Sequence, residues 1–574
     1  MTQNFPDAWG LMAQEFLQTL TDGWSKALAS WQEPDWAAMG NMGKGMPDQL
    51  PGMRFTAEKL QALQQQYLQD SLSMFDPAFL QARLATDKRF SDPAWSSNPV
   101  AMHLAAFYLL NARTLLGLVD ALEADAKTRG RMRFVMEQWL AAAAPSNFMA
   151  FNPQAQQKAT DTQGESLARG RENLEKDVRQ GHLSMTDEQQ FHVGKNLATT
   201  EGAVVFENEY FQLIEYKPRT AQVFEKPLLM VPPCINKFYI LDLQISNSLV
   251  RYALDAGQHV FMLSWRNPDA SLSQATWEDY IEHGIIRAIE VTRTIATVAI
   301  INVLGFCIGG TMLVTALAVL AGRGVKPVEC ATLLTTLLDF SGCGVLDLFI
   351  DEALVQGIEK EMGQGGLMPG RNLASVFSFL RPNDLVWNYL VKNYLLGETP
   401  PAVDLLYWNT DCTNLAGPYL SWYLRNTYLE NNLVKPAKLT VCGQPLDLGL
   451  VDMPVYIYGS REDHIVPVAA AYASNALLPG AKRFVMGASG HIAGVINPPH
   501  AQKRSYWLRN DGVLPKTQAE WLEGATEHAG SWWPDWLEWL KGHAGDLVPA
   551  PQQYGKDPYL ALQAAPGSYV LAKA

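Results

Sequence analysis

The pattern of apolar and polar residues divides this chain of 574 residues into two parts. Up to about residue 187, apolar residues recur at helical spacing, most clearly over residues 60–67 and 105–120, which predicts helices there. A stretch rich in glycine and proline, residues 40–52, predicts a flexible connection. We therefore expect residues 1–187 to form a mainly helical N-terminal domain.

From about residue 202, short apolar runs alternate with helical segments. Strands are predicted at residues 210–216, 227–233, 259–265, 298–304, 330–340, 453–459 and 483–486. Helices are predicted over residues 277–296, with Thr276 as the N-cap, and over residues 311–320. Apolar strands that alternate with helices form parallel sheets covered on both faces, so residues 188–574 are predicted to form an α/β domain.

The alternation stops after residue 340 and resumes at residue 453. The residues between are aromatic and helix-prone. We expect residues 341–445 to be an insertion between late strands of the sheet. From that position we infer that it forms a lid or cap over the active site.

The hexapeptide GFCIGG, residues 305–310, lies between a predicted strand and a predicted helix. This is the context of the nucleophile elbow of the α/β-hydrolase fold, in which flanking glycines permit a strained turn that exposes the nucleophile. Cys307 stands where that elbow usually has serine. A free cysteine is most often a small buried residue, but the strand, the glycines and the helix favour a nucleophile here.

In this fold the nucleophile, the acid and the histidine follow one another along the chain, each on a loop after a strand. Asp463 follows the strand predicted at 453–459, and His491 follows the strand at 483–486. We therefore predict that they are the catalytic partners of Cys307. Asp339 is the serious rival to Asp463 because some hydrolases place their acid after the preceding strand. The other histidines near these loops, His464 and His500, are less favoured.

The predicted chemistry is acyl transfer. His491 would take the thiol proton, and Cys307 would attack an acyl carbonyl to form a covalent acyl-enzyme. Backbone N–H groups of Ile308 and Cys234 are predicted to hold the oxyanion, because the two residues before Cys234 are prolines and cannot donate. Exchange of one thioester for another is nearly isoenergetic, so a cysteine nucleophile indicates a thioester donor and an acceptor other than water.

Composition and charge limit the classes of partner and the cellular compartment that we expect. A net charge of −13 gives no indication of nucleic-acid binding. Six cysteines without C-x-x-C spacing argue against zinc and disulfides and favour a reducing cytoplasm. The sequence shows no signal peptide and no apolar run near the ~20 residues of a membrane span, so we expect a soluble intracellular protein.

Tryptophans gather near both ends of the chain, where they either contact a lipid-like surface or pack in the core. They are Trp9, Trp24, Trp31, Trp36 and Trp95, and then Trp532, Trp533, Trp536 and Trp539.

The GFCIGG box resembles that of polyhydroxyalkanoate synthases, most closely the class I, single-subunit type. Further segments resemble the same family and together cover roughly residues 90–570. They are NPQA (152–155), NLATTEG (196–202), PPCINKFYILD (232–242), SWRNP (264–268), WYLRNTY (422–428), GSREDHIVP (459–467) and GHIAG (490–494).

The resemblance implies polymerisation of (R)-3-hydroxyacyl-CoA, most of all short monomers such as 3-hydroxybutyryl-CoA, with release of CoA and without a cofactor. It implies that Cys307 is the nucleophile, that His491 is the base, and that Asp463 helps to activate the 3-hydroxyl group. It also implies a homodimer in the cytoplasm on polyhydroxyalkanoate granules, together with the growing chain and granule-coat proteins. The N-terminal region would then serve granule contact, dimer contact or both.

Other interpretations remain open. An intracellular depolymerase or a thioesterase could use the same sheet and triad, and a non-enzymatic granule-coat protein would explain only the tryptophans. The CoA site is not located by the sequence. Lys237, Arg266 and Arg381 are candidates only as basic residues in rim segments, and a solvated surface position is the simpler expectation for each.

Overall fold

The computed structural model describes residues 54–574, so the connection expected at residues 40–52 lies outside it, as do Trp9, Trp24, Trp31 and Trp36. The described residues form two compact units. Residues 54–86 and 103–137 form one, here called the helical unit, and residues 87–102 and 138–574 form the other, the main unit.

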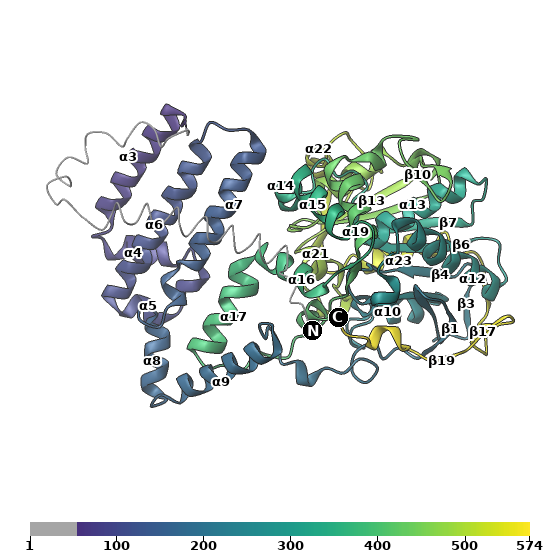
Figure 1. Cartoon of the computed structure of the whole chain (residues 1–574), viewed down its shortest axis with the longest axis horizontal. Coiled ribbons are helices and arrows are strands. Elements are labelled where there is room, and N and C mark those ends of the chain that lie inside the picture. Colours follow the sequence, from purple (N-terminus) through teal and green to yellow (C-terminus); the bar gives the residue numbers. More distant parts are fainter. Residues whose placement is uncertain (1–53) are drawn as a thin grey trace. The chain divides into compact units, whose positions relative to one another are not determined.

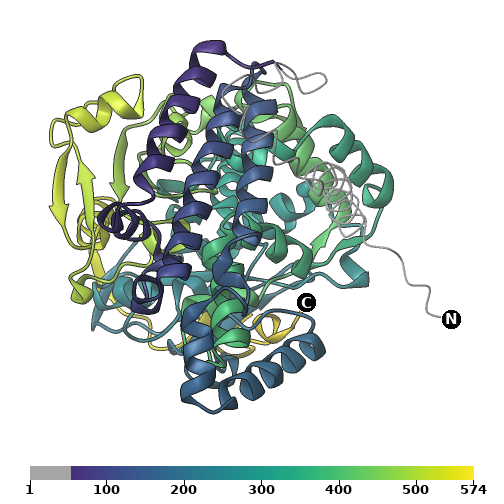
Figure 2. The same ribbon diagram turned by 90° about the vertical axis from the view of Figure 1, so that its left-hand side faces the viewer.

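The helical unit consists of α3 (Ala57–Ser73), α4 (Pro77–Leu84) and most of α6 (Pro99–Ala121) and α7 (Ala126–Ala142). Figures 1 and 2 show α3, α6 and α7 running side by side. The buried carboxylate of Asp70 forms ion pairs with Arg83 and Arg113, which joins α3, α4 and α6. The helices predicted at residues 60–67 and 105–120 are thus present within α3 and α6.

Helix α6 differs from the expectation that no apolar run approaches the length of a membrane span. It is 23 residues long and, by length and composition alone, could cross a membrane. The expectation that no apolar run approaches this length was therefore wrong. A packing helix of a soluble domain meets the same criterion.

An 11-stranded sheet organises the main unit, in the order β15-β14-β13-β12-β7-β6-β4-β5-β2-β1-β19. Its strands are β1 (Gly202–Glu207), β2 (Phe211–Tyr216), β4 (Leu228–Val231), β5 (Val260–Trp265), β6 (Ile301–Phe306), β7 (Val328–Leu334), β12 (Val455–Ser460), β13 (Lys482–Gly487), β14 (Ser505–Leu508), β15 (Thr526–Ala529) and β19 (Gln563–Ala564). The six central strands, from β5 to β13, are parallel, whereas the strands at both edges are antiparallel. The parallel sheet expected from the sequence is therefore a mixed sheet.

Helices flank this sheet (Figure 1). They include α10 (Leu249–Asp255), α12 (Arg287–Ala296), α13 (Ile308–Gly322), α20 (Val468–Ala473), α21 (His491–Val495) and α23 (Trp533–Lys541). The predicted helix at 277–296 is present as three consecutive helical segments, and Thr276 caps it with a capping box that includes Asp279. Strand β4 and its neighbours are completely buried, as expected for parallel strands covered on both faces.

Helices also fill the segment between β7 and β12. They are α14 (Val345–Phe349), α15 (Glu352–Met362), α16 (Gly370–Phe379), α17 (Asn388–Leu390), α18 (Asp404–Thr410) and α19 (Gly417–Tyr423). Strand β7 ends at Leu334, six residues earlier than predicted, because the chain turns at Thr335, where φ is 42°. The apolar residues that follow pass the first turn of α13, where the hydroxyl of Thr311 donates to the carbonyl of Leu337 at 2.7 Å.

The tryptophans near the C-terminus pack in the interior. Trp532, Trp533 and Trp536 are each at most 1% exposed, and Trp539 packs against the same core. Trp95 is also buried. For these residues, the packing interpretation is the one that the structure supports.

Candidate active site

Cys307 is the single residue between strand β6 and helix α13. Its backbone has φ 54° and ψ −127°, a conformation that a residue with a side chain rarely adopts. The turn is tight because a Cβ on Gly305 would lie 2.5 Å from the Cα of Gly310, and one on Gly310 would lie 2.1 Å from Thr336 Oγ1. Glycine is therefore required at both positions, and the strained turn leaves the Cys307 side chain partly exposed.

Asp463 and His491 meet beside Cys307. The two residues follow β12 and β13, which are adjacent parallel strands, so the loops after them lie at the same edge of the sheet. Asp463 Oδ2 lies 2.6 Å from His491 Nδ1. The other oxygen, Asp463 Oδ1, accepts hydrogen bonds from the N–H groups of Ile465 and Val466 at 2.8 and 2.9 Å. The thiol of Cys307 is near enough to the imidazole of His491 to affect its charge.

The buried surroundings of His491 determine the pKa of its imidazole. Side-chain exposure is 6% for His491 and 0% for Asp463. Burial works against the charged imidazole, but the Asp463 carboxylate and the Cys307 thiol outweigh it and raise the pKa of His491 to about 10. The raised pKa favours the protonated imidazole, which the Asp463 carboxylate stabilises.

Helix α21, which begins at His491, is held from behind by the C-terminal tryptophans. The indole N–H of Trp532 donates to the carbonyl of Gly494 at 3.1 Å, and that of Trp533 donates to Val495 at 2.9 Å. The ring of Phe306 stacks on the imidazole with centroids 5.7 Å apart. The orientation of His491 is thus supported both by contacts of its ring and by contacts of the helix that it begins.

The rivals considered from sequence lie in other environments. Asp339 Oδ1 accepts hydrogen bonds from the N–H of Ser341 and from the side chain of Asn431, at 2.9 and 2.8 Å. His464 is adjacent to Asp463, but its Nδ1 is buried without a partner among the described residues, and burial lowers its pKa to about 4. His500 is exposed on the turn Pro499–Ala501.

The two predicted oxyanion donors, Ile308 and Cys234, lie on adjoining segments. Ile308 is the first residue of α13, where the N–H has no partner within the helix. Cys234 lies in the loop that follows β4, residues 232–239, here called the β4 loop. Within residues 54–574, neither N–H donates a backbone hydrogen bond to another residue. A Cβ on Gly309 would lie 2.6 Å from the Pro232 carbonyl oxygen, so the elbow and the β4 loop are in direct contact.

The basic residues considered for CoA have different surroundings. Lys237 is only 2% exposed, and its Nζ donates to the carbonyl of Ala572 at 2.5 Å, so the expectation of a solvated surface lysine was wrong. Burial lowers the pKa of Lys237 to about 8. Arg266 is ion-paired with Asp269 at 2.7 Å, and Arg381 with Asp384 at 2.8 Å.

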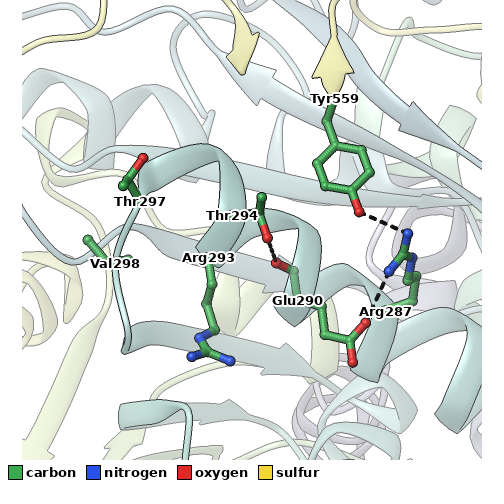
Figure 3. A pocket seen from close by; sticks show the side chains of 7 residues that line it. All are labelled: Arg287, Glu290, Arg293, Thr294, Thr297, Val298 and Tyr559. Atoms are coloured by element: carbon green, nitrogen blue, oxygen red, sulfur yellow. Dashed lines mark hydrogen bonds and ion pairs between the residues drawn. The ribbon is translucent and has the colours of Figure 1, made fainter. Parts of the chain in front are cut away.

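A separate cavity of about 630 Å³ lies at the C-terminal end of α12 (Figure 3). Arg287 in its wall donates to Tyr559 Oη at 2.9 Å and pairs with Glu290 at 3.2 Å. None of the predicted site residues lines it. Helix α12 ends just before β6 begins, whereas Cys307 follows the end of β6, so this cavity lies at the opposite end of that strand.

Two tyrosines of the WYLRNTY segment, Tyr423 and Tyr428, were not predicted as site residues, although that segment resembles the family. The rings of Tyr423 and Tyr428 pack edge to face at 5.6 Å, and Phe340 packs against Tyr428 at 4.9 Å. Burial, aided by nearby thiols that include Cys307, raises the pKa of both hydroxyls well above the usual range. They therefore remain neutral phenols near Cys307.

Comparison with family models gives the class of protein to which the chain belongs. Residues 227–498 match the model of the alpha/beta hydrolase fold, and residues 86–253 match the model described as the N-terminus of poly-beta-hydroxybutyrate polymerase (PhaC). The protein is therefore an α/β-hydrolase-fold acyltransferase. Among solved structures, a monoacylglycerol lipase from Paleococcus ferrophilus has 14% identity and a TM-score of 0.32 over 49% of this chain and 90% of that one.

Curated relatives give the family. The chain is 57% identical to the poly(3-hydroxyalkanoate) polymerase subunit PhaC of Cupriavidus necator, over 92% of each chain. It is 40% identical to the poly(3-hydroxyalkanoate) polymerase of Methylorubrum extorquens, over 85% of this chain and 81% of that one. The chain belongs to the poly(3-hydroxyalkanoate) polymerase family, which confirms the resemblance seen in the sequence.

Proposed function

We propose that this chain polymerises short-chain (R)-3-hydroxyacyl-CoA, such as 3-hydroxybutyryl-CoA, into polyhydroxyalkanoate as a class I, single-subunit enzyme. The observation that carries the proposal is a thiol, Cys307, on a strained turn beside a buried His491–Asp463 pair. The 57% identity to the Cupriavidus necator polymerase supports the same activity and substrate class.

Cys307 forms the acyl-enzyme. Its thiolate attacks the thioester carbonyl, and the N–H groups of Ile308 and Cys234 receive the oxyanion. The carbon–sulfur bond to CoA then breaks as the bond to Cys307 forms, and the departing CoA thiolate takes the proton of the His491 imidazolium. One thioester replaces another, so this half-reaction is close to balanced.

A hydroxyl group completes the cycle. The 3-hydroxyl of a monomer or chain attacks the acyl-Cys307 carbonyl, and neutral His491 accepts its proton. The ester bond forms while the bond to Cys307 breaks and the thiolate returns. Asp463 supports the positive imidazolium and in this way helps to activate the hydroxyl. Conversion of a thioester to an oxoester drives this half-reaction forward.

The remaining parts of the chain have proposed roles that rest on the resemblance. Residues 1–187 form an N-terminal domain for dimer or granule contact, and residues 188–574 form the catalytic domain with residues 341–445 as its lid. The enzyme works as a homodimer in the cytoplasm on the surface of polymer granules, where it meets the growing chain and granule-coat proteins. The reaction requires no cofactor, since CoA is only the leaving group.

Release of CoA from (R)-3-hydroxybutyryl-CoA, followed together with turbidity, tests the function. We expect both signals from the wild type and neither from Cys307→Ala, and intact mass should reveal an acyl adduct only on the wild type. Release of CoA without polymer would identify a thioesterase, and preference for polymer over acyl-CoA a depolymerase. Activity that survives in Cys307→Ala would refute the mechanism.

A further inference from the structure

A strap of four residues from the segment between β7 and β12, residues 411–414, runs along the β4 loop. Asn236 and Cys412 form an antiparallel backbone bridge. The hydroxyl of Thr413 donates to the carbonyl of Cys234 at 2.7 Å, and the N–H of Thr413 donates to the carbonyl of Ile235 at 3.4 Å. Thr413 and Cys234 are 1% and 2% exposed, so no water competes for these bonds.

Neighbouring contacts strengthen the same attachment. The indole N–H of Trp408 donates to the carbonyl of Lys237 at 2.7 Å, and Tyr239 Oη donates to Asp411 Oδ2 at 2.8 Å. At the start of the loop, Trp265 Nε1 donates to the carbonyl of Pro232 at 2.9 Å. Since Pro232 and Pro233 have no N–H, hydrogen bonds to their carbonyls and to later residues must fix this loop.

We propose that Thr413 is a positioning residue that aims the N–H of Cys234 at the oxyanion. This inference rests on the proposed function. A hydrogen bond to the Cys234 carbonyl restricts rotation on the C-terminal side of this residue, while the contact between Gly309 and Val231 fixes the loop on the N-terminal side. The backbone N–H of Cys234 makes no backbone hydrogen bond to another described residue. This N–H can therefore donate to the substrate oxygen.

The alternative is that Thr413 only satisfies a buried carbonyl, in which case its loss would reduce stability without selecting one step of the reaction. Two chemical probes of the same thiol separate these roles. Attack on a thioester develops an oxyanion, whereas alkylation of Cys307 by iodoacetamide displaces iodide and develops none. A misplaced oxyanion donor therefore slows the first reaction and leaves the second unchanged.

The test compares Thr413→Val, Thr413→Ser and the control Thr292→Val with the wild type. Thr292 is fully buried and its hydroxyl has no partner among the described residues, so the control removes a buried hydroxyl that bonds nothing. Measurements are the first-turnover release of CoA from saturating (R)-3-hydroxybutyryl-CoA, the rate of Cys307 alkylation and the melting temperature.

We expect CoA release by Thr413→Val to fall ten- to a hundredfold, with the alkylation rate unchanged. Thr413→Ser, which keeps the hydroxyl, and Thr292→Val should stay within about threefold of the wild type. A folded Thr413→Val with wild-type CoA release, or with parallel losses in both reactions, would overturn the inference. If Thr413→Val does not fold, Thr413→Ala serves the same comparison. Absence of CoA release by the wild type would instead refute the proposed function.

Discussion

Gly309, in the first turn of α13, should not tolerate even one additional methyl group. A Cβ there would lie 2.5 Å from the carbonyl oxygen of Val231 and 2.6 Å from that of Pro232. Ordinary contact begins at 3.4 Å, so the start of the β4 loop would have to retreat by about 0.9 Å in Gly309→Ala. Both obstacles are backbone atoms, which cannot rotate away as a side chain can.

The retreat should affect catalysis more than stability. It separates the N–H of Cys234 from that of Ile308, and a misplacement of about 1 Å costs on the order of a hundredfold in rate. Overpacking of this kind destabilises a protein by about 1–3 kcal/mol, which a domain of this size survives. We therefore expect Gly309→Ala to fold and to lose about a hundredfold in the first turnover of CoA release.

The assay compares Gly309→Ala with Gly357→Ala. Gly357 lies within α15, and a Cβ there meets nothing within 4 Å, so the same substitution should leave the rate unchanged and stabilise the helix by up to about 1 kcal/mol. Stopped-flow release of CoA gives the rate, and thermal unfolding shows that each variant is folded. A folded Gly309→Ala that releases CoA at the wild-type rate would refute the assigned oxyanion geometry.

Three further predictions concern the acid, its pH dependence and a helix cap. Asp463→Asn should reduce kcat of steady-state CoA release about 10⁴-fold, whereas kcat of Asp339→Asn should stay within about twofold of the wild type. Equal losses of kcat in the two variants would restore Asp339 as the rival acid. Because the pKa of His491 is raised to about 10, the stability advantage of the wild type over Asp463→Asn should be fully present below about pH 6.5 and lost as the pH rises through 10. Urea unfolding of both proteins across that window measures it, and an advantage that grows with pH would contradict the sign. Thr276→Ala removes a capping box and should destabilise the protein by about 1 kcal/mol, seen as a lower melting temperature without loss of kcat.

Much of the fold and the arrangement of the site could be predicted because their signals are local. The strained turn needs glycines within a few residues of Cys307, and buried parallel strands need uninterrupted apolar runs. The positions of Asp463 and His491 follow from the order of adjacent parallel strands. The antiparallel edges were missed because short apolar segments carry no direction. The early end of β7 was missed because Leu337, Leu338 and Phe340 are buried without being in a strand.

Contacts across long sequence separations left no such signal. Thr413 reaches Cys234 across 179 residues, and Lys237 is buried against the carbonyl of Ala572, 335 residues away. Nothing in the surrounding sequence distinguishes this threonine from a solvated one, or this lysine from a surface lysine. Both depend on where the segment between β7 and β12 and the C-terminal residues lie against the β4 loop, which is a property of the tertiary structure.

On the proposed mechanism, formation of the acyl-enzyme itself converts His491 from an acid into a base. Two partners, the Asp463 carboxylate and the Cys307 sulfur, raise the pKa of the imidazole against the effect of burial. Acylation turns the sulfur of Cys307 into an uncharged thioester, so one partner is lost while burial persists, and the pKa of His491 must fall. The imidazolium can thus protonate the departing CoA, and the neutral ring that remains can accept the proton of the incoming hydroxyl. Asp463 alone then stabilises the returning imidazolium, which is how a buried carboxylate paired with His491 serves both half-reactions.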